Sequence, residues 1–329
     1  MRIASNPPAS AAGGSGFSLL ANWWARAEVP TFMVALVVYG GWLLLTWYGQ
    51  LLPWWILAAL GGGGVCLHGS LQHEIVHGHP TSNKNINTLL ALPPLALWMP
   101  YLIYRDTHIA HHKSGHLTCP RRDPESFYVN ADRWAQMNAL KKATLRLNNT
   151  LAGRLTLGPV LAIAGFWGRE LRRIAGGDLR YARVWVAHLL GCVVVLAWVA
   201  GFCGMPIWQY LLLFVWPGLS LTLLRSYTEH RPAPEQAYRT AVVEACLPLR
   251  LLFLNNNYHA LHHEQPGVPW YELRTRYQSA RDEILHRNRA FVFRGYGEVF
   301  RRYTLVRKDE PVHALNDQAR ARHRGEKCG

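Results

Sequence analysis

The stretch HIAHH at His108–His112 decides how this chain must fold, because it concentrates three imidazoles in five residues. A near-copy, HALHH, occurs at His259–His263, and a related HEIVH occurs at His73–His77. If these segments are helical, residues at i, i+3 and i+4 lie on one face, so the rings of each cluster point the same way. Two copies of HxxHH and one HxxxH predict that distant parts of the chain meet at one metal site.

The composition around these clusters is that of a membrane protein. Hydrophobic residues make up 50% of the chain and charged residues only 17%, against about 25% charged in typical soluble domains. The 14 Trp and 14 Tyr residues suit the interface between membrane and water.

The basic residues are segregated, which explains the net charge of +15 better than nucleic-acid binding does. Of the 35 Lys and Arg residues, all but Arg2 and Arg26 lie in residues 84–183 and 225–329. Such segregation follows the positive-inside rule. We therefore expect the basic loops, the histidine clusters and both termini on the cytoplasmic side. We expect no binding of nucleic acid. The short length of the chain favours a bacterial cytoplasmic membrane.

Four apolar segments are comparable in length with the ~20 helical residues that cross a bilayer. They are residues 31–49, 51–72, 184–203 and 207–224. Short connections at Gln50–Pro53 and Gly204–Pro206 predict two helical hairpins.

A fifth apolar segment, Ile86–Tyr104, is interrupted by Pro93 and Pro94 and ends near Pro100. If it crossed the membrane, His77 and His108 would lie on opposite sides and could not share a site. We therefore expect it to be re-entrant or interfacial. Residues 155–168 are too short to span and basic at both ends, so we expect them to lie flat on the surface.

The predicted fold class is all-α: a polytopic membrane protein with four transmembrane helices in two hairpins and a cytosolic helical cap that holds a His-rich dimetal site. An interfacial helix over 241–254 should deliver the last histidine cluster, and no strand is expected. The predicted organisation is a flexible cytosolic tail (1–28), a membrane domain (29–306) and a basic C-terminal tail (307–329).

The candidate metal ligands number nine when His230, just after the last span, is included. A tetrahedral zinc ion takes four ligands, whereas two metals of five to six coordination would nearly be filled and would keep positions for water or dioxygen. Imidazole suits iron, copper, nickel and zinc alike. The nine are His73, His77, His108, His111, His112, His230, His259, His262 and His263.

These clusters resemble the three histidine boxes of the membrane fatty acid desaturase superfamily, which also contains carotenoid ketolases and hydroxylases. The boxes are HEIVHGH at His73–His79, HIAHH at His108–His112 and NYHALHH at Asn257–His263, and His230 is similar to the family's isolated extra histidine. The resemblance covers roughly residues 30–306. It implies a non-haem di-iron centre that uses O2 to remove hydrogens from an unactivated carbon chain held in a long apolar pocket.

The resemblance also implies an external source of two electrons. The sequence has no flavin or dinucleotide glycine motif and no His-Pro-Gly-Gly haem signature, since Thr81 and Ser82 follow His79-Pro80. We expect a separate carrier such as a ferredoxin, and the basic face would attract an acidic one.

Polar residues close to the clusters in sequence are candidates to orient the rings through their second nitrogen. They are Glu74, Asp106, Asp123, Glu229, Asn256 and Glu264.

Several functions stay open at this stage. An acyl-lipid fatty acid desaturase is preferred, but Asp123–Glu125 and Pro266–Trp270 also resemble carotenoid ketolases, and a ketolase, hydroxylase or other lipid oxygenase is the alternative. HEIVH is also a literal HExxH, the signature of zinc metalloproteases, but it accounts for only two of the nine histidines. A metal transporter would need polar residues along its spans as a path, and these spans are nearly free of ionisable groups.

Overall fold

The computed structural model describes residue 24 and residues 27–314 of the 329-residue chain. Regular structure in this part is almost all helical, as predicted. Most of the predicted tail 1–28 and the end of the C-terminal tail lie outside the described residues.

Four helical segments within the described residues are long and apolar enough to cross a membrane: Val29–Leu51, Trp54–Val76, Ala182–Phe202 and Ile207–Glu229. They confirm the four predicted spans, with ends that differ from the predicted ones by at most five residues. The first comprises α2 (Val29–Tyr48) and the turn η1 (Gly49–Leu51), and the second is α3 (Trp54–Val76). The third comprises α10 (Ala182–Leu196) and η2 (Ala197–Phe202); the fourth comprises α11 (Ile207–Tyr210), η3 (Leu211–Val215) and α12 (Trp216–Glu229).

The two hairpin turns lie at the same end of the bundle. Pro53 precedes the first residue of α3, and Pro206 precedes the first residue of α11. Gly204 adopts a φ of +64° in the second turn, a conformation that favours glycine. The side-chain amide of Gln50 in the first turn donates to the carbonyl oxygen of Gly204 at 3.0 Å, so the turns are joined directly.

Helices α3 and α12 pack at very short range. A Cβ atom added to Gly62 would lie 2.7 Å from the Cβ of Pro217, and one added to Gly218 would lie 2.6 Å from the Cβ of Val65. Small residues allow membrane helices to approach in this way. The contact sets the spacing between the helix ends that carry His73 and His230.

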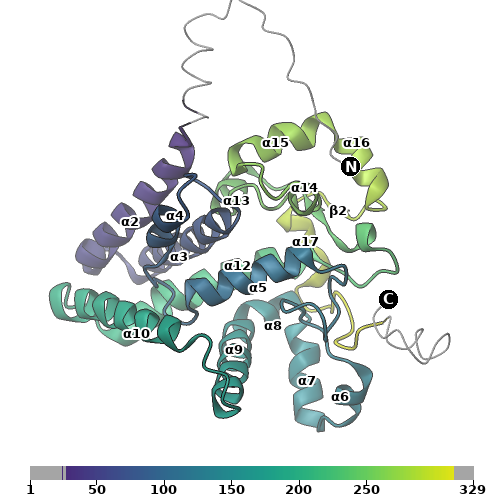
Figure 1. Cartoon of the computed structure of the whole chain (residues 1–329), viewed down its shortest axis with the longest axis horizontal. Helices are drawn as coiled ribbons and strands as arrows, with labels where there is room; N and C mark the ends of the chain where they lie inside the picture. Colours follow the sequence, from purple (N-terminus) through teal and green to yellow (C-terminus); the bar gives the residue numbers. More distant parts are fainter. Residues whose placement is uncertain (1–23, 25–26, 315–329) are drawn as a thin grey trace, which may run out of the picture.

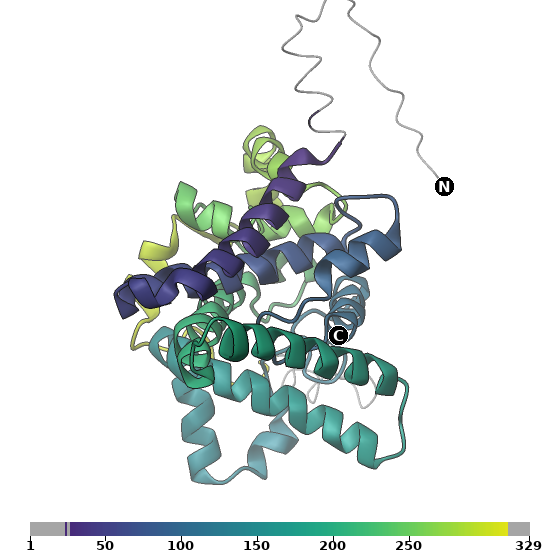
Figure 2. The ribbon, with the colours of Figure 1, turned by 90° about the vertical axis from the view of Figure 1, so that its left-hand side faces the viewer.

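Helices α2 and α10 present an apolar face to the outside, and Figure 2 shows both on the side that faces the viewer. Large side chains that stay more than half exposed include Leu36 and Leu44 on α2 and Leu190 and Val194 on α10. An apolar surface of this extent suits lipid.

The segment Ile86–Tyr104 does not form a span. It comprises most of α4 (Lys84–Ala91), an irregular stretch through the prolines, and the start of α5 (Tyr101–Lys113). The stretch enters the helical bundle, because Leu95 is buried and its carbonyl oxygen accepts from the Tyr210 hydroxyl at 2.6 Å. The chain thus returns from α3 to α5 on one side, as the shared site requires.

Four helices follow α5: α6 (Ala131–Ala135), α7 (Ala139–Asn148), α8 (Leu151–Thr156) and α9 (Gly158–Ala175). The first three are capped by Asn130, Asn138 and Thr150, each of which accepts a hydrogen bond from a main-chain N–H in the first turn. The apolar stretch expected to lie on the surface falls within α8 and α9.

The remaining elements follow α12 in the chain and form a cap, of which α14, α15, α16, β2 and α17 are seen in the right half of Figure 1. They are η4 (Gln236–Arg239), β1 (Val242–Val243), α13 (Leu247–Leu252), α14 (His259–Glu264), α15 (Trp270–Ser279), α16 (Arg281–Arg287), β2 (Val292–Phe293) and α17 (Tyr296–Tyr303).

The cap contains a small sheet that the sequence analysis did not expect. β1 and β2 pair in parallel, with Val242 opposite Val292, and the predicted helix over 241–254 shrinks to α13. The main-chain N–H of Val243 donates to the Asn257 carbonyl at 2.8 Å, and that of Ala260 donates to the Ala241 carbonyl at 2.9 Å. A six-residue helix such as α14 needs tertiary support of this kind.

Candidate metal centre

The nine predicted histidines all converge, in two groups. The first histidine group consists of His73, His77, His108, His112 and His262, and the second consists of His111, His230, His259 and His263. Within each group the candidate ligand atoms all lie within 4.8 Å of one another.

Facing Nε2 atoms define each group. In the first, the Nε2 of His108 lies 3.3 Å from that of His77 and 3.1 Å from that of His112, and the His112 and His262 Nε2 atoms lie 3.2 Å apart. The ring of His73 stands 4.6 Å, centroid to centroid, from those of both His108 and His262.

In the second group, the Nε2 of His230 lies 3.2 Å from that of His111 and 3.1 Å from that of His259. The His263 and His259 Nε2 atoms lie 3.1 Å apart. The groups adjoin, because the rings of His112 and His263 are stacked with centroids 4.2 Å apart.

The two HxxHH segments divide their rings in opposite ways. On α5, His108 and His112 contribute to the first group and His111 to the second. On α14, His259 and His263 contribute to the second group and His262 to the first. The i and i+4 rings of a helix stay together while the i+3 ring turns to the other group.

Asp123 is hydrogen-bonded to the Nδ1 atom of His111, which faces away from the second histidine group. The Nδ1 of His111 lies 2.8 Å from an Asp123 oxygen, and both side chains are buried. When Nδ1–H donates to a carboxylate, the lone pair of Nε2 points into the group, where a metal would bind.

Glu125 holds the Nδ1 of His108 at 3.0 Å, and the sequence analysis did not select it. The Asp123-Pro124-Glu125 run that follows α5 is the sequence signal that points to it. Burial would raise the pKa of Glu125, yet the adjacent His108, with His111 and His112, lowers it below its usual range.

Asn256 and Glu229 surround the ring of His259. Its Nδ1 lies 3.0 Å from the Asn256 side-chain oxygen and 3.5 Å from a Glu229 oxygen. Glu229 also forms an ion pair with Arg225 at 3.0 Å, which neutralises a buried carboxylate.

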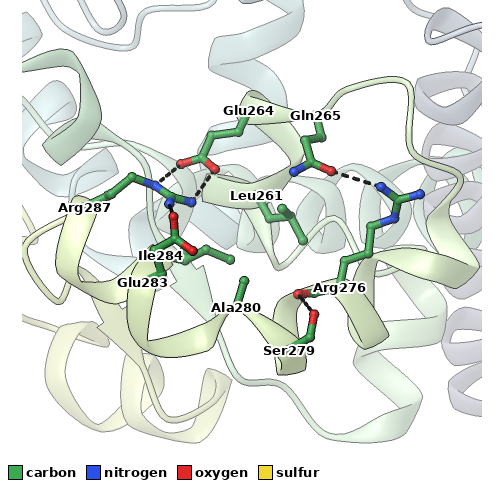
Figure 3. Close-up of a pocket in the computed structure, with 9 residues that line it drawn as sticks. All are labelled: Leu261, Glu264, Gln265, Arg276, Ser279, Ala280, Glu283, Ile284 and Arg287. Carbon is green, nitrogen blue, oxygen red and sulfur yellow. Dashed lines mark hydrogen bonds and ion pairs between the residues drawn. The ribbon is translucent and has the colours of Figure 1, made fainter. Parts of the chain in front are cut away.

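The other three polar candidates bind elsewhere. Glu74 accepts from the main-chain N–H of Trp270 at 2.9 Å, so HEIVH does not aim its Glu at the rings as a protease would require. Asp106 pairs with Arg105 and accepts from the Tyr181 hydroxyl. Glu264 pairs with Arg287 on the outer side of α14 (Figure 3).

Burial and mutual repulsion keep most of the rings neutral. Burial, followed by neighbouring rings, lowers the pKa of His77 to about 3, of His112 to about 2 and of His230 to about 3. The same causes lower the pKa of His259, His262 and His263 well below the usual value.

His111 is the exception. Burial alone would lower its pKa, but the hydrogen bond to Asp123 and the charge of Glu125 raise it above the ordinary value.

The donor set fits a pair of metal ions. Neutral imidazole nitrogens 3.1–3.3 Å apart can share at most one proton per pair, so several lone pairs face one another inside each group. A cation relieves this repulsion, and neutral imidazole is the form that binds metal.

Nearby histidines outside the two groups have other partners. The Nδ1 of His79 lies 2.6 Å from Glu28, and His116 accepts from the Arg122 guanidinium at 2.7 Å. His68 is buried within α3, where its ring contacts that of Tyr39.

A cavity of about 420 Å³ opens onto both groups and runs between α5, α9 and α12. Its lining includes His108 from the first group and His230 and His259 from the second. Apolar side chains form much of the remaining wall, among them Trp98, Leu161, Phe166, Leu219 and Leu223. An elongated apolar molecule in this cavity would meet the rings directly.

A known protein family matches most of the chain. Residues 49–295 match the family described as fatty acid desaturase. No curated protein matches the sequence.

Proposed function

Since the chain belongs to the fatty acid desaturase family, we propose that it is an O2-dependent non-haem di-iron desaturase that introduces a C=C bond into the acyl chain of a lipid. The observation that carries the proposal is the apolar cavity, which reaches rings of both histidine groups. In the reaction the acyl chain loses two hydrogens, and O2 accepts these, two further electrons and two protons to give two waters.

Each histidine group would hold one iron ion. Five rings would surround the first ion and four the second. Bound iron supplies the oxidising power that removes hydrogen from an unactivated C–H bond. The protein's own part is to fix the rings, through Asp123, Glu125 and Asn256, and to hold the acyl chain against them.

The polar parts of the cavity wall would limit which lipid enters. Arg133 and Arg169 line the cavity and are exposed, so either guanidinium is available to the anionic head of a lipid. The apolar side chains of the wall, among them Leu161, Phe166 and Leu223, would contact the acyl chain.

The proposed electron donor is a separate acidic carrier such as a ferredoxin. A surface pocket lies on the outer side of α14, where Leu261, Glu264 and Gln265 form one wall and Arg276 and Arg287 stand opposite (Figure 3). Leu261 in the pocket wall is the residue before His262 on α14, and the same helix carries His263. This short path supports electron entry here.

The four apolar helices and the family make the chain an integral membrane protein. The proposed location is the bacterial cytoplasmic membrane with the rings on the cytosolic side. The segregation of Lys and Arg into residues 84–183 and 225–329 supports this orientation.

The test is to express the chain in a bacterium with a defined lipid and carotenoid content and to analyse both by mass spectrometry. We expect new unsaturated acyl chains with the natural sequence and none with His108→Ala. An unchanged acyl profile with oxygenated carotenoid would replace the proposal by a carotenoid ketolase or hydroxylase. Metal analysis that finds zinc and no iron would overturn both.

A further inference from the structure

Residues 307–313, which follow α17, pack against the part of the fold that holds the histidines. This C-terminal strap (Arg307–His313) lies beyond the family match, which ends at residue 295, and inside the predicted basic tail. The N–H of Lys308 donates to the Asn149 carbonyl at 3.0 Å, and the N–H of His313 donates to the Val129 carbonyl at 3.0 Å. Main-chain bonds therefore fix the strap between α7 and the loop that follows α5 (Figure 1).

Lys308 reaches from the strap to one candidate ligand. Its ammonium donates to the main-chain carbonyl of His230 at 2.7 Å. The side chain is 11% exposed, lies 3.4 Å from Asp309 and stands over the ring of Tyr227. A charge as buried as this one persists only when it is paired and hydrogen-bonded.

Within the part of the chain that the structure describes, His230 lacks the Nδ1 partner that two other rings of its group have. Its Nδ1 is buried and has no hydrogen-bond partner among the described residues, whereas the Nδ1 atoms of His111 and His259 contact Asp123 and Asn256. His230 follows the last residue of α12 with extended φ and ψ of −132° and 152°. Its ring is consequently oriented through its own main chain, which pairs with Thr240 in an antiparallel bridge and whose carbonyl oxygen accepts from Lys308.

His313 provides a second route from the strap to the same group. It is fully buried, and its Nε2 is hydrogen-bonded to the Thr118 hydroxyl at 2.9 Å. The Thr118 N–H donates at 2.7 Å to Asp123, whose other oxygen contacts His111.

We propose that the C-terminal strap positions the second histidine group for metal, with Lys308 as the positioning residue for His230 and His313 as that for His111. Both routes end in the second group, so the strap acts on that metal and leaves the first group's metal in place. The inference rests on the proposed function, because it assumes that each group holds an ion.

The test is an anaerobic titration of ferrous ion into the metal-free, full-length protein in detergent, for the natural sequence, Lys308→Met, Lys308→Arg and the control Lys141→Met. Lys141 is exposed on α7. For Lys308→Met we expect one tight ion and a second bound about 10–100-fold more weakly, the usual effect of losing a group that orients a ligand. Lys308→Arg, which keeps a charged donor, should restore most of the second affinity, and the control should match the natural sequence.

A second-site affinity that is unchanged or raised in Lys308→Met would overturn the inference alone; a rise would mean that the ammonium merely repels the ion. Should that variant not fold, Thr118→Val decides, because it removes the His313 route while Lys308 stays. Two equally tight ions in Thr118→Val would then overturn the inference. A natural sequence that binds fewer than two ions would overturn the proposed function itself.

Discussion

The segments HIAHH on α5 and HALHH on α14 have the same spacing, yet the groups they build are unequal. Each gives two rings to one group and one ring to the other. The inequality comes from the third segment that supplies rings to each group. The end of α3 adds His73 and His77 to the first group, while the end of α12 adds only His230 to the second. Near-repetition in the sequence therefore produces two different metal environments.

The difference is also one of support. His73 lies on a 23-residue helix and His77 caps its end, so the helix itself sets their spacing. His230 lies past the end of α12 and depends on neighbours for its orientation. Helix α3 therefore sets two rings of the first group, whereas His230 of the second group depends on contacts from distant parts of the chain.

Removing the equivalent i+4 ring from each segment should give the largest effect. Both His112→Ala and His263→Ala should abolish desaturation. The first group would keep four rings and the second only three, so metal content measured by mass spectrometry should fall further in His263→Ala. Equal retention of iron in the two variants would contradict the inequality of the groups.

Replacing the carboxylates that orient the α5 rings should give the next largest effect. Asp123→Asn should weaken binding in the second group and Glu125→Gln in the first, each by about 10–100-fold in metal affinity. Asp123 should have the stronger effect, since its side chain is 2% exposed and that of Glu125 is 30% exposed. Ferrous titration of both variants checks this, and an equal loss at both sites in either variant would contradict it.

A change at the contact between α3 and α12 should affect both groups together. Gly62→Ala would force its new methyl against Pro217, which we expect to lower the free energy of unfolding by about 1–3 kcal/mol and to weaken both irons. Gly63→Ala is the matched control, because a Cβ there meets nothing within 4 Å. Thermal unfolding in detergent compares them, and equal melting temperatures would show that the contact is not tight.

The sequence was sufficient for the spans and the ring set because both follow from short-range rules. Apolar length predicted α2, α3, α10 and α12, and helical spacing brought the candidate rings onto common faces. The sequence did not assign the rings to the two groups. His111 and His262 each belong to a different group from the other two rings of their segment, and this depends on how α5 and α14 face each other. Nor did the sequence reveal Glu125, the sheet β1–β2 or Lys308, which act through contacts between residues far apart in the chain.

The smallest predicted effect separates two neighbouring rings of HIAHH by pH. His112 has a lowered pKa of about 2, against about 6.5 unfolded, so below pH 6.5 the unfolded chain takes up a proton that the folded chain does not, and stability falls. His111 has a raised pKa, so its contribution is fully present below the unfolded value and is lost as the pH rises through the folded value. Each ring contributes on the order of 1 kcal/mol per pH unit at most.

Acidifying the metal-free protein from pH 7.5 to 5.5 should therefore lower its melting temperature less in His112→Gln and more in His111→Gln than in the natural sequence. His286→Gln, an exposed change on α16, is the control and should follow the natural sequence. The prediction fails if both variants change the pH dependence of the melting temperature in the same direction. Asp123 would then not set the pKa of His111 apart from that of His112.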